Sequence, residues 1–194
     1  GKAGTTQWLR RLASALGDGV AALLEAQLSA LDKKFESEWS GFADRAGVYR
    51  AGFVLGPGDA AKLIDPTQSG GVHVPAMLAE MGFGLDFLEF QEGGKPASVD
   101  VKKLRDSLSG SPRHAVAQFS DRAELLKHLR SGRLAIVYSN LRSDQRLTRN
   151  GLIGFSLRDF EMGFSGALRT IRRLVERCEA PFFRENSKHL RIEP

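Results

Sequence analysis

Apolar residues recur at steps of three and four along residues 6–42, which is the spacing of one face of an amphipathic helix. Gly17-Asp18-Gly19 interrupts this stripe, and two glycines so close together cost about 2 kcal/mol of helix propensity. The pattern therefore predicts either one helix with a kink or two helices, with Asp18 as the N-cap of the second.

The stripe has two interpretations. It is the surface of a partner-binding or dimerising helix, or it packs on the protein's own domain. Because most such stripes face a core, the spacing favours packing within the chain. The residues that would form a partner helix are Trp8, Leu12, Leu16, Phe35 and Trp39.

Beyond Gly47 the periodicity changes, and short apolar segments alternate with amphipathic ones. The apolar segments predict strands at residues 48–56, 83–91, 114–119, 133–141 and 152–157. Helices are expected from Asp59, Pro75, Ser98 and Asp121, and a long one from residue 156 or 158 to Cys178. The last strand reads as the return of a hairpin, because Asn150-Gly151 is a strong turn signal.

These elements predict an α/β or α+β fold with a three- to five-stranded sheet flanked by helices and preceded by an N-terminal amphipathic helix or helix pair. The corresponding segments are an N-terminal helical segment (1–46), an α/β domain (47–180) and a C-terminal tail (181–194). A chain of 194 residues is long enough to bury a sizeable core without disulfides.

The single cysteine, Cys178, cannot form an internal disulfide. A lone thiol is typical of a reducing compartment, so we expect a cytoplasmic protein. The first residues lack the uninterrupted apolar region of a signal peptide. No apolar run approaches the roughly 20 residues that a membrane helix needs, so no membrane span is expected.

Charge is distributed unevenly along the chain. Residues 1–100 carry a net charge of −4 and residues 101–194 carry +9, for a total of +5. Such asymmetry is typical of a basic surface that meets an acidic partner. Most of the cations in the second half are arginines, whose planar fork suits phosphate and carboxylate groups.

Two groups of arginines are the strongest candidates for this surface. One lies between two apolar segments and the other forms a stripe on the predicted long helix. Neutral donors near the first group are of the kind that contact phosphate and sugar. Carboxylates are interspersed, however, and could pair with some of the arginines. The candidate residues are Arg142, Arg146, Arg149, Arg169, Arg172, Arg173 and Arg177.

Catalytic chemistry has little support in the sequence. The four histidines are far apart and show no metal-ligand spacing with one another or with Cys178. No GxSxG, HExxH or GxGxxG pattern occurs. The turn GPGD at residues 56–59 reads as a plain turn, because Asp59 would itself occupy the N–H groups that a phosphate needs. We therefore assign no catalytic, cofactor or metal residue.

Three functions follow in order of preference. The first is a non-enzymatic protein that binds an acidic polymer, most simply nucleic acid, through phosphate contacts. The second is a subunit of a protein assembly, joined to copies of itself or to an acidic protein through the N-terminal aromatic helix and the opposite charges of its two halves. The third and weakest is a small enzyme with an unrecognised site.

Overall fold

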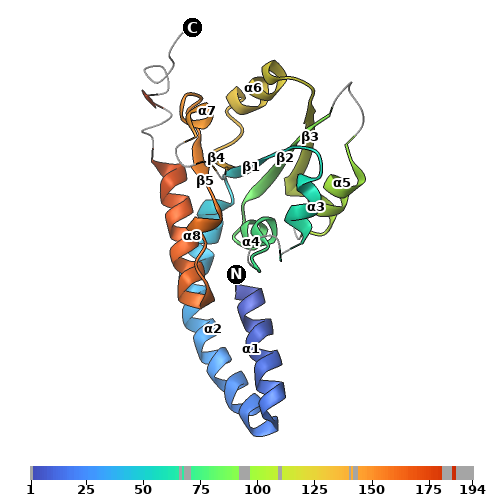
Figure 1. Ribbon diagram of the computed structural model, residues 1–194. Coiled ribbons are helices and arrows are strands. Elements are labelled where there is room, and N and C mark those ends of the chain that lie inside the picture. Colours follow the sequence, from blue (N-terminus) through green and yellow to red (C-terminus); the bar gives the residue numbers. More distant parts are fainter. Residues whose placement is uncertain are drawn as a thin grey trace.

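A five-stranded parallel sheet forms the centre of the molecule (Figure 1). The computed structural model describes residues 2–65, 67, 71–91, 97–108, 111–139, 141, 144–180 and 185–186. The strand order is β3-β2-β1-β4-β5, and each neighbouring pair is parallel. The α/β class and a sheet at the upper end of the predicted size are thus confirmed. The strands are β1 (Arg50–Leu55), β2 (Gly84–Phe90), β3 (His114–Phe119), β4 (Ile136–Tyr138) and β5 (Ile153–Phe155).

Helices cover both faces of the sheet. Two long helices, α2 (Asp18–Ala46) and α8 (Gly163–Glu179), lie side by side at one end of the sheet (Figure 1). The shorter helices are α3 (Asp59–Ile64), α4 (Val74–Glu80), α5 (Val99–Asp106), α6 (Arg122–Arg130) and α7 (Gln145–Thr148). No helix in the described part of the chain is long and apolar enough to cross a membrane.

Successive residues of a strand point to opposite faces of the sheet, and two apolar clusters result. Phe87 belongs to the main core, to which α2, α4, α5 and α8 contribute. Leu88 belongs to a smaller cluster with residues of α6 and α7. Gly52 in β1 allows close packing on the second face, since a Cβ there would lie 2.8 Å from a methyl group of Leu134.

The N-terminal stripe forms two helices, α1 (Lys2–Leu16) and α2. The break falls at Gly17, whose φ of 109° is a conformation that glycine adopts without strain. Gly17 is also the N-cap of α2, so the expectation that Asp18 fills this role is wrong. Gly47 is the C-cap of α2.

The segment after β4 differs from its prediction. β5 runs parallel to β4 rather than returning as a hairpin strand. The chain makes the crossover through α7. The N-cap of this helix is Asp144, whose carboxylate accepts a hydrogen bond from the Arg146 N–H. A short helix thus replaces the expected loop, and Asn150-Gly151 follows that helix instead of joining two antiparallel strands.

α8 begins at Gly163, later than the predicted start at residue 156 or 158. Ser156 and Asp159 form a capping box around a single 3-10 turn, Leu157–Asp159. The chain is extended at Phe160 before it enters the helix. This places Asp159 and Glu161 beside α8 instead of on it, which determines the partners of the α8 arginines.

His73 has a structural role at the start of α4. Its Nδ1 accepts a hydrogen bond from the Ala76 N–H at 3.1 Å, so it is the N-cap of the helix. Burial lowers the pKa of His73 below its ordinary value of 6.5. Only the neutral ring has a free lone pair at Nδ1, so burial and the cap favour the same protonation state.

We predict that replacing His73 with alanine lowers the free energy of unfolding by about 1 kcal/mol through loss of the cap. Because the pKa is lower in the folded state, the stabilisation is complete above pH 6.5 and is lost as the pH falls below that value. His73→Asn should retain a cap but not this pH dependence. Urea unfolding of the wild type, His73→Ala and His73→Asn between neutral and acidic pH checks both expectations. Parallel stability curves for the wild type and His73→Asn would contradict the pH dependence.

Candidate functional site: an apolar face on the helical hairpin

α1 and the first half of α2 form an antiparallel hairpin that projects away from the sheet (Figure 1). Its base is tied to the body of the protein. The Ala3 N–H donates to Glu80 of α4 at 2.9 Å, and Lys2 forms an ion pair with Glu36. Leu9, Ala13, Leu24 and Leu28 are buried or half-buried in this mostly exposed hairpin, so we infer that they form the seam between the two helices.

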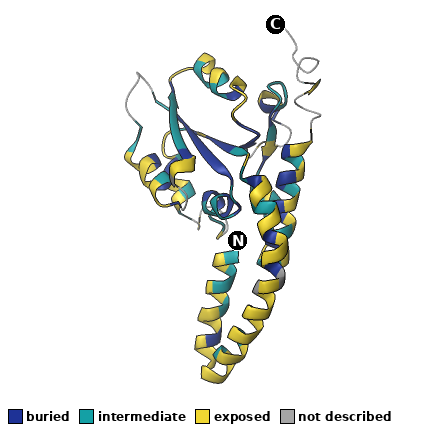
Figure 2. Cartoon of the chain, turned by 180° about the vertical axis from the view of Figure 1, so that it is seen from behind, coloured by how far each residue is buried: buried dark blue, intermediate teal, exposed yellow. Residues whose placement is uncertain are grey.

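Little of this hairpin is buried, and most of its length is exposed in Figure 2. Within residues 2–31, all of which the structure describes, only Ala13 and Leu28 are buried. Helices of this length owe most of their stability in proteins to packing of an apolar face. A helix such as α1, with only one buried residue, therefore gains little stability from packing within the chain and could gain more by packing against another surface.

The two sides of the hairpin differ in chemistry. Arg10 follows the seam residue Leu9, and Glu25 follows the seam residue Leu24. Arg10 and Glu25 form an ion pair at 2.7 Å, so the residues that follow the seam share one side. In an antiparallel pair, the residues that precede the seam must then share the other side, because each step turns a helix by about 100°.

The side opposite that ion pair is apolar. Trp8 precedes Leu9, and Leu23 precedes Leu24, so both lie on this side. On α1, Leu12 and Leu16 lie four and eight residues after Trp8. On α2, Val20 lies three residues before Leu23 and Leu31 lies eight residues after it, and these steps keep all of them near the same side of the helix. Each of the side chains is between 43% and 65% exposed. We call this set the apolar face, and its residues are Trp8, Leu12, Leu16, Val20, Leu23 and Leu31.

Charge is sparse in the part of the hairpin that carries five of the six residues of the apolar face. Residues 12–31 include only two charged side chains, Asp18 and Glu25, whereas 26% of the chain is charged. Glu25 lies on the opposite side with Arg10, which holds the pKa of that carboxyl below its ordinary value. A solvated helical hairpin normally carries charge on its exposed positions, so this composition is unusual for a surface that faces only water.

The predicted partner helix is divided by the fold. Trp8, Leu12 and Leu16 lie on the apolar face, where they are exposed. Phe35 and Trp39 lie in the main core, with their ring centroids 5.0 Å apart. Phe35 also makes an edge contact with Phe164 of α8. The one stripe therefore serves two purposes, packing within the chain in its second half and exposure in its first.

No protein-family model, curated protein or solved structure matches this chain.

The arginines of α8 already have partners. Glu161 accepts hydrogen bonds from Arg169 and Arg173, each at 2.6 Å, and they lower the pKa of its carboxyl. Arg177 lies 2.9 Å from a carboxylate oxygen of Asp159. Two carboxylates beside the helix therefore offset most of the charge of these three arginines.

The other described arginines of the candidate set also have partners within the chain. Arg172 lies 5.3 Å from the ring centroid of Phe42 and 3.8 Å from a carboxylate oxygen of Glu38. Arg146 of α7 binds the buried Asp144, and Arg149, the C-cap of α7, donates to the side-chain oxygen of Gln145. No hydrogen bond or ion pair joins the α7 and α8 groups among the residues described, and Arg142 lies outside those residues. Contact between these arginines and nucleic acid stays a prediction.

The carboxyl ends of the strands are the usual place for a ligand in a parallel sheet of this kind. Here the polar groups at that edge are used within the chain. The Gly56 N–H donates to Asp59 at 2.9 Å, which agrees with the interpretation of GPGD as a plain turn. Glu89 lines a hollow of about 330 Å³ that is bounded by the turn after β1, the end of β2 and the start of α5, and its carboxylate accepts a hydrogen bond from the Ser98 N–H. Among the residues that the structure describes, this edge does not present a group of convergent donors.

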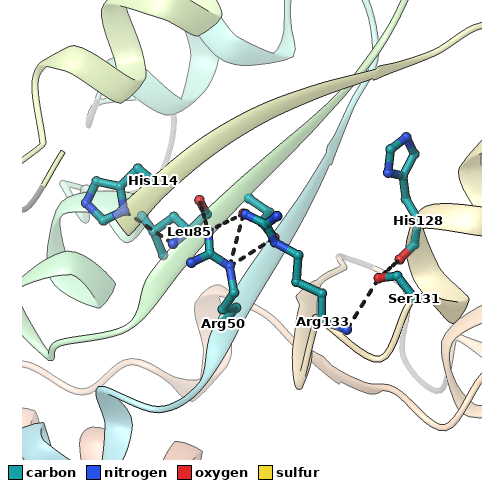
Figure 3. A network of polar contacts seen from close by, with 7 residues as sticks. Arg50, Leu85, His114, His128, Ser131 and Arg133 are labelled. Carbon is teal, nitrogen blue, oxygen red and sulfur yellow. Dashed lines mark hydrogen bonds and ion pairs between the residues drawn. The ribbon is translucent and has the colours of Figure 1, made fainter. Parts of the chain in front are cut away.

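A buried polar network lies near the opposite ends of the strands (Figure 3). Asp86 of β2 is almost fully buried and binds Arg50, the first residue of β1. Arg133, just before β4, donates to the same carboxylate at 2.7 Å and 3.1 Å. Next to them, the Leu85 N–H donates to Nδ1 of His114 at 3.2 Å. The network ties three adjacent strands together, so we assign it a structural role.

Histidine, cysteine and carboxylate side chains do not gather into a metal site in the described part of the chain. Cys178 is buried near the end of α8. The apolar face is therefore the feature of the structure with the clearest functional meaning, and the low charge of residues 12–31 was the sequence signal that could have distinguished it from the rest of the stripe.

Proposed function

We propose that this chain is a subunit of a protein assembly and that the apolar face of the α1–α2 hairpin is its contact surface. The observation that carries the proposal is the combination of six large exposed apolar side chains on one side of the hairpin with only two buried residues within residues 2–31. Exposed apolar side chains of this size are common singly, but a contiguous group on one face is typical of an interaction site.

The balance of forces supports a protein partner. Complete burial of a large apolar side chain contributes about 1.5–3 kcal/mol relative to exposure. Each of the six side chains would contribute part of this free energy on contact with a partner, because each is already partly covered within the chain. Tryptophan is enriched among residues that dominate binding energy, and Trp8 is one of the six residues of the face.

The arginine-rich surface provides a weaker basis for a function. A phosphate group would have to replace Glu161 and Asp159 as the partner of three arginines, with those carboxylates left close by. By contrast, contact at the apolar face would break no hydrogen bond or ion pair that its six side chains make. We therefore favour the assembly over nucleic-acid binding.

Site-specific cross-linking tests the proposal. A photoreactive amino acid at position 23 lies on the apolar face, and one at position 29 replaces the exposed Ser29 on the side with the Arg10–Glu25 ion pair. We expect irradiation in the native host to give a covalent adduct with protein at position 23, and much less at position 29. Equal yields at the two positions, or no adduct at position 23, would contradict the proposed function.

A further inference from the structure

We infer that the partner is a second copy of this chain, and that the two apolar faces pack on each other about a two-fold axis to form a four-helix bundle. This inference rests on the proposed function, because it names the occupant of the same face.

The shape of the hairpin fits this partner. Two antiparallel helices joined by a tight turn are half of a four-helix bundle, in which each pair covers the apolar stripes of the other. Both helices of the hairpin contribute to the face, with Trp8 and Leu12 from α1 and Leu23 and Leu31 from α2. The 15 residues of α1 span about 22 Å at 1.5 Å per residue, a length over which several layers of side chains can interdigitate.

The charge pattern also fits self-association. In a two-fold contact, the same patch of both copies meets, so charges near the axis face like charges. Such contacts cost free energy where charges are present. Here the cost is avoided, because the apolar face is uncharged and Glu25 is paired with Arg10 on the other side. A face that selects an acidic or basic partner would carry complementary charges, and residues 12–31 lack them apart from Asp18 and Glu25.

The exposed area is sufficient for a reversible dimer. The six side chains are each 43–65% exposed, so the face offers about as much contact area per copy as three fully exposed large apolar side chains. Two copies would thus form a small interface, near the lower limit of about 1,200 Å² for specific interfaces. We therefore expect a dimer that dissociates on dilution.

Sedimentation equilibrium over a concentration series tests the inference with two matched variants. Leu23→Asp adds a carboxylate to the apolar face at its most exposed leucine, and Ser29→Asp adds the same group on the opposite side. We expect wild type and Ser29→Asp to share a monomer–dimer equilibrium, and the dissociation constant of Leu23→Asp to rise at least tenfold. Matching circular dichroism spectra of the three chains establish that each is folded.

A wild-type chain that stays monomeric at every concentration would overturn the inference, as would equal weakening by the two substitutions. The mass of the adduct at position 23 separates this inference from the proposed function. An adduct of twice the chain mass supports both. An adduct with a different protein overturns the second copy as partner but leaves the proposed function intact, and the absence of any adduct overturns both.

Discussion

Replacing Asp86 with asparagine should lower the free energy of unfolding by about 3 kcal/mol, because removal of one charge from a buried ion pair leaves the others without a counter-charge. Arg50 is the more affected partner, since its side chain is only 22% exposed. Arg133 is 53% exposed and can be solvated where it lies. Urea denaturation of the monomeric chain measures the change directly.

Asp106→Asn is the matched control for this substitution. Asp106 also pairs with an arginine, Arg105, but its side chain is 57% exposed. Exposed ion pairs contribute about 0–1 kcal/mol, so the control should unfold close to wild type. A similar loss in the two variants would show that the network of Asp86 does not hold β1, β2 and the start of β4 together in the way that we describe.

The two tryptophans should respond in opposite ways to replacement with alanine. Trp39→Ala should lower the free energy of unfolding by about 3–5 kcal/mol, which is the usual cost of removing a large aromatic side chain from a core. Trp8→Ala should change the stability of the monomer by less than about 0.5 kcal/mol, because the side chain is exposed there. Trp8→Ala should instead weaken association.

Unfolding curves recorded at the lowest practical protein concentration, and sedimentation at higher concentration, give both quantities for each variant. A large loss of monomer stability from Trp8→Ala would mean that α1 packs on the body of the protein more extensively than its exposure indicates. An unchanged free energy of unfolding for Trp39→Ala would mean that the second half of α2 does not pack in the core.

The elements with strong periodicity could be predicted from the sequence. The apolar pattern located the strand at residues 114–119, and the paired glycines predicted the break near Gly17. The direction of β5 could not be read in this way. Asn150-Gly151 favours a hairpin locally, but the Asp144 cap and the buried Leu147 hold α7 as a crossover, and that tertiary contact decides the pairing.

The candidate site was only partly visible in the sequence. Helical spacing places Trp8 and Trp39 on the same stripe, and spacing alone cannot show that α8 covers one and leaves the other exposed. The same limit applies to the arginines. Arg169 and Arg173 share a stripe on α8, but their pairing with Glu161 depends on the extended segment before the helix. Composition carried the missing signal, since few charges occur where the hairpin projects from the body.

The most direct measurement for the central claim is the yield of cross-linked protein at position 23 relative to position 29 in the native host. If the apolar face is a contact surface, the adduct forms at position 23 and its yield is much lower at position 29. If position 23 faces solvent in the cell, the two positions react alike or neither reacts. The hairpin is then not the site at which this protein contacts its partner.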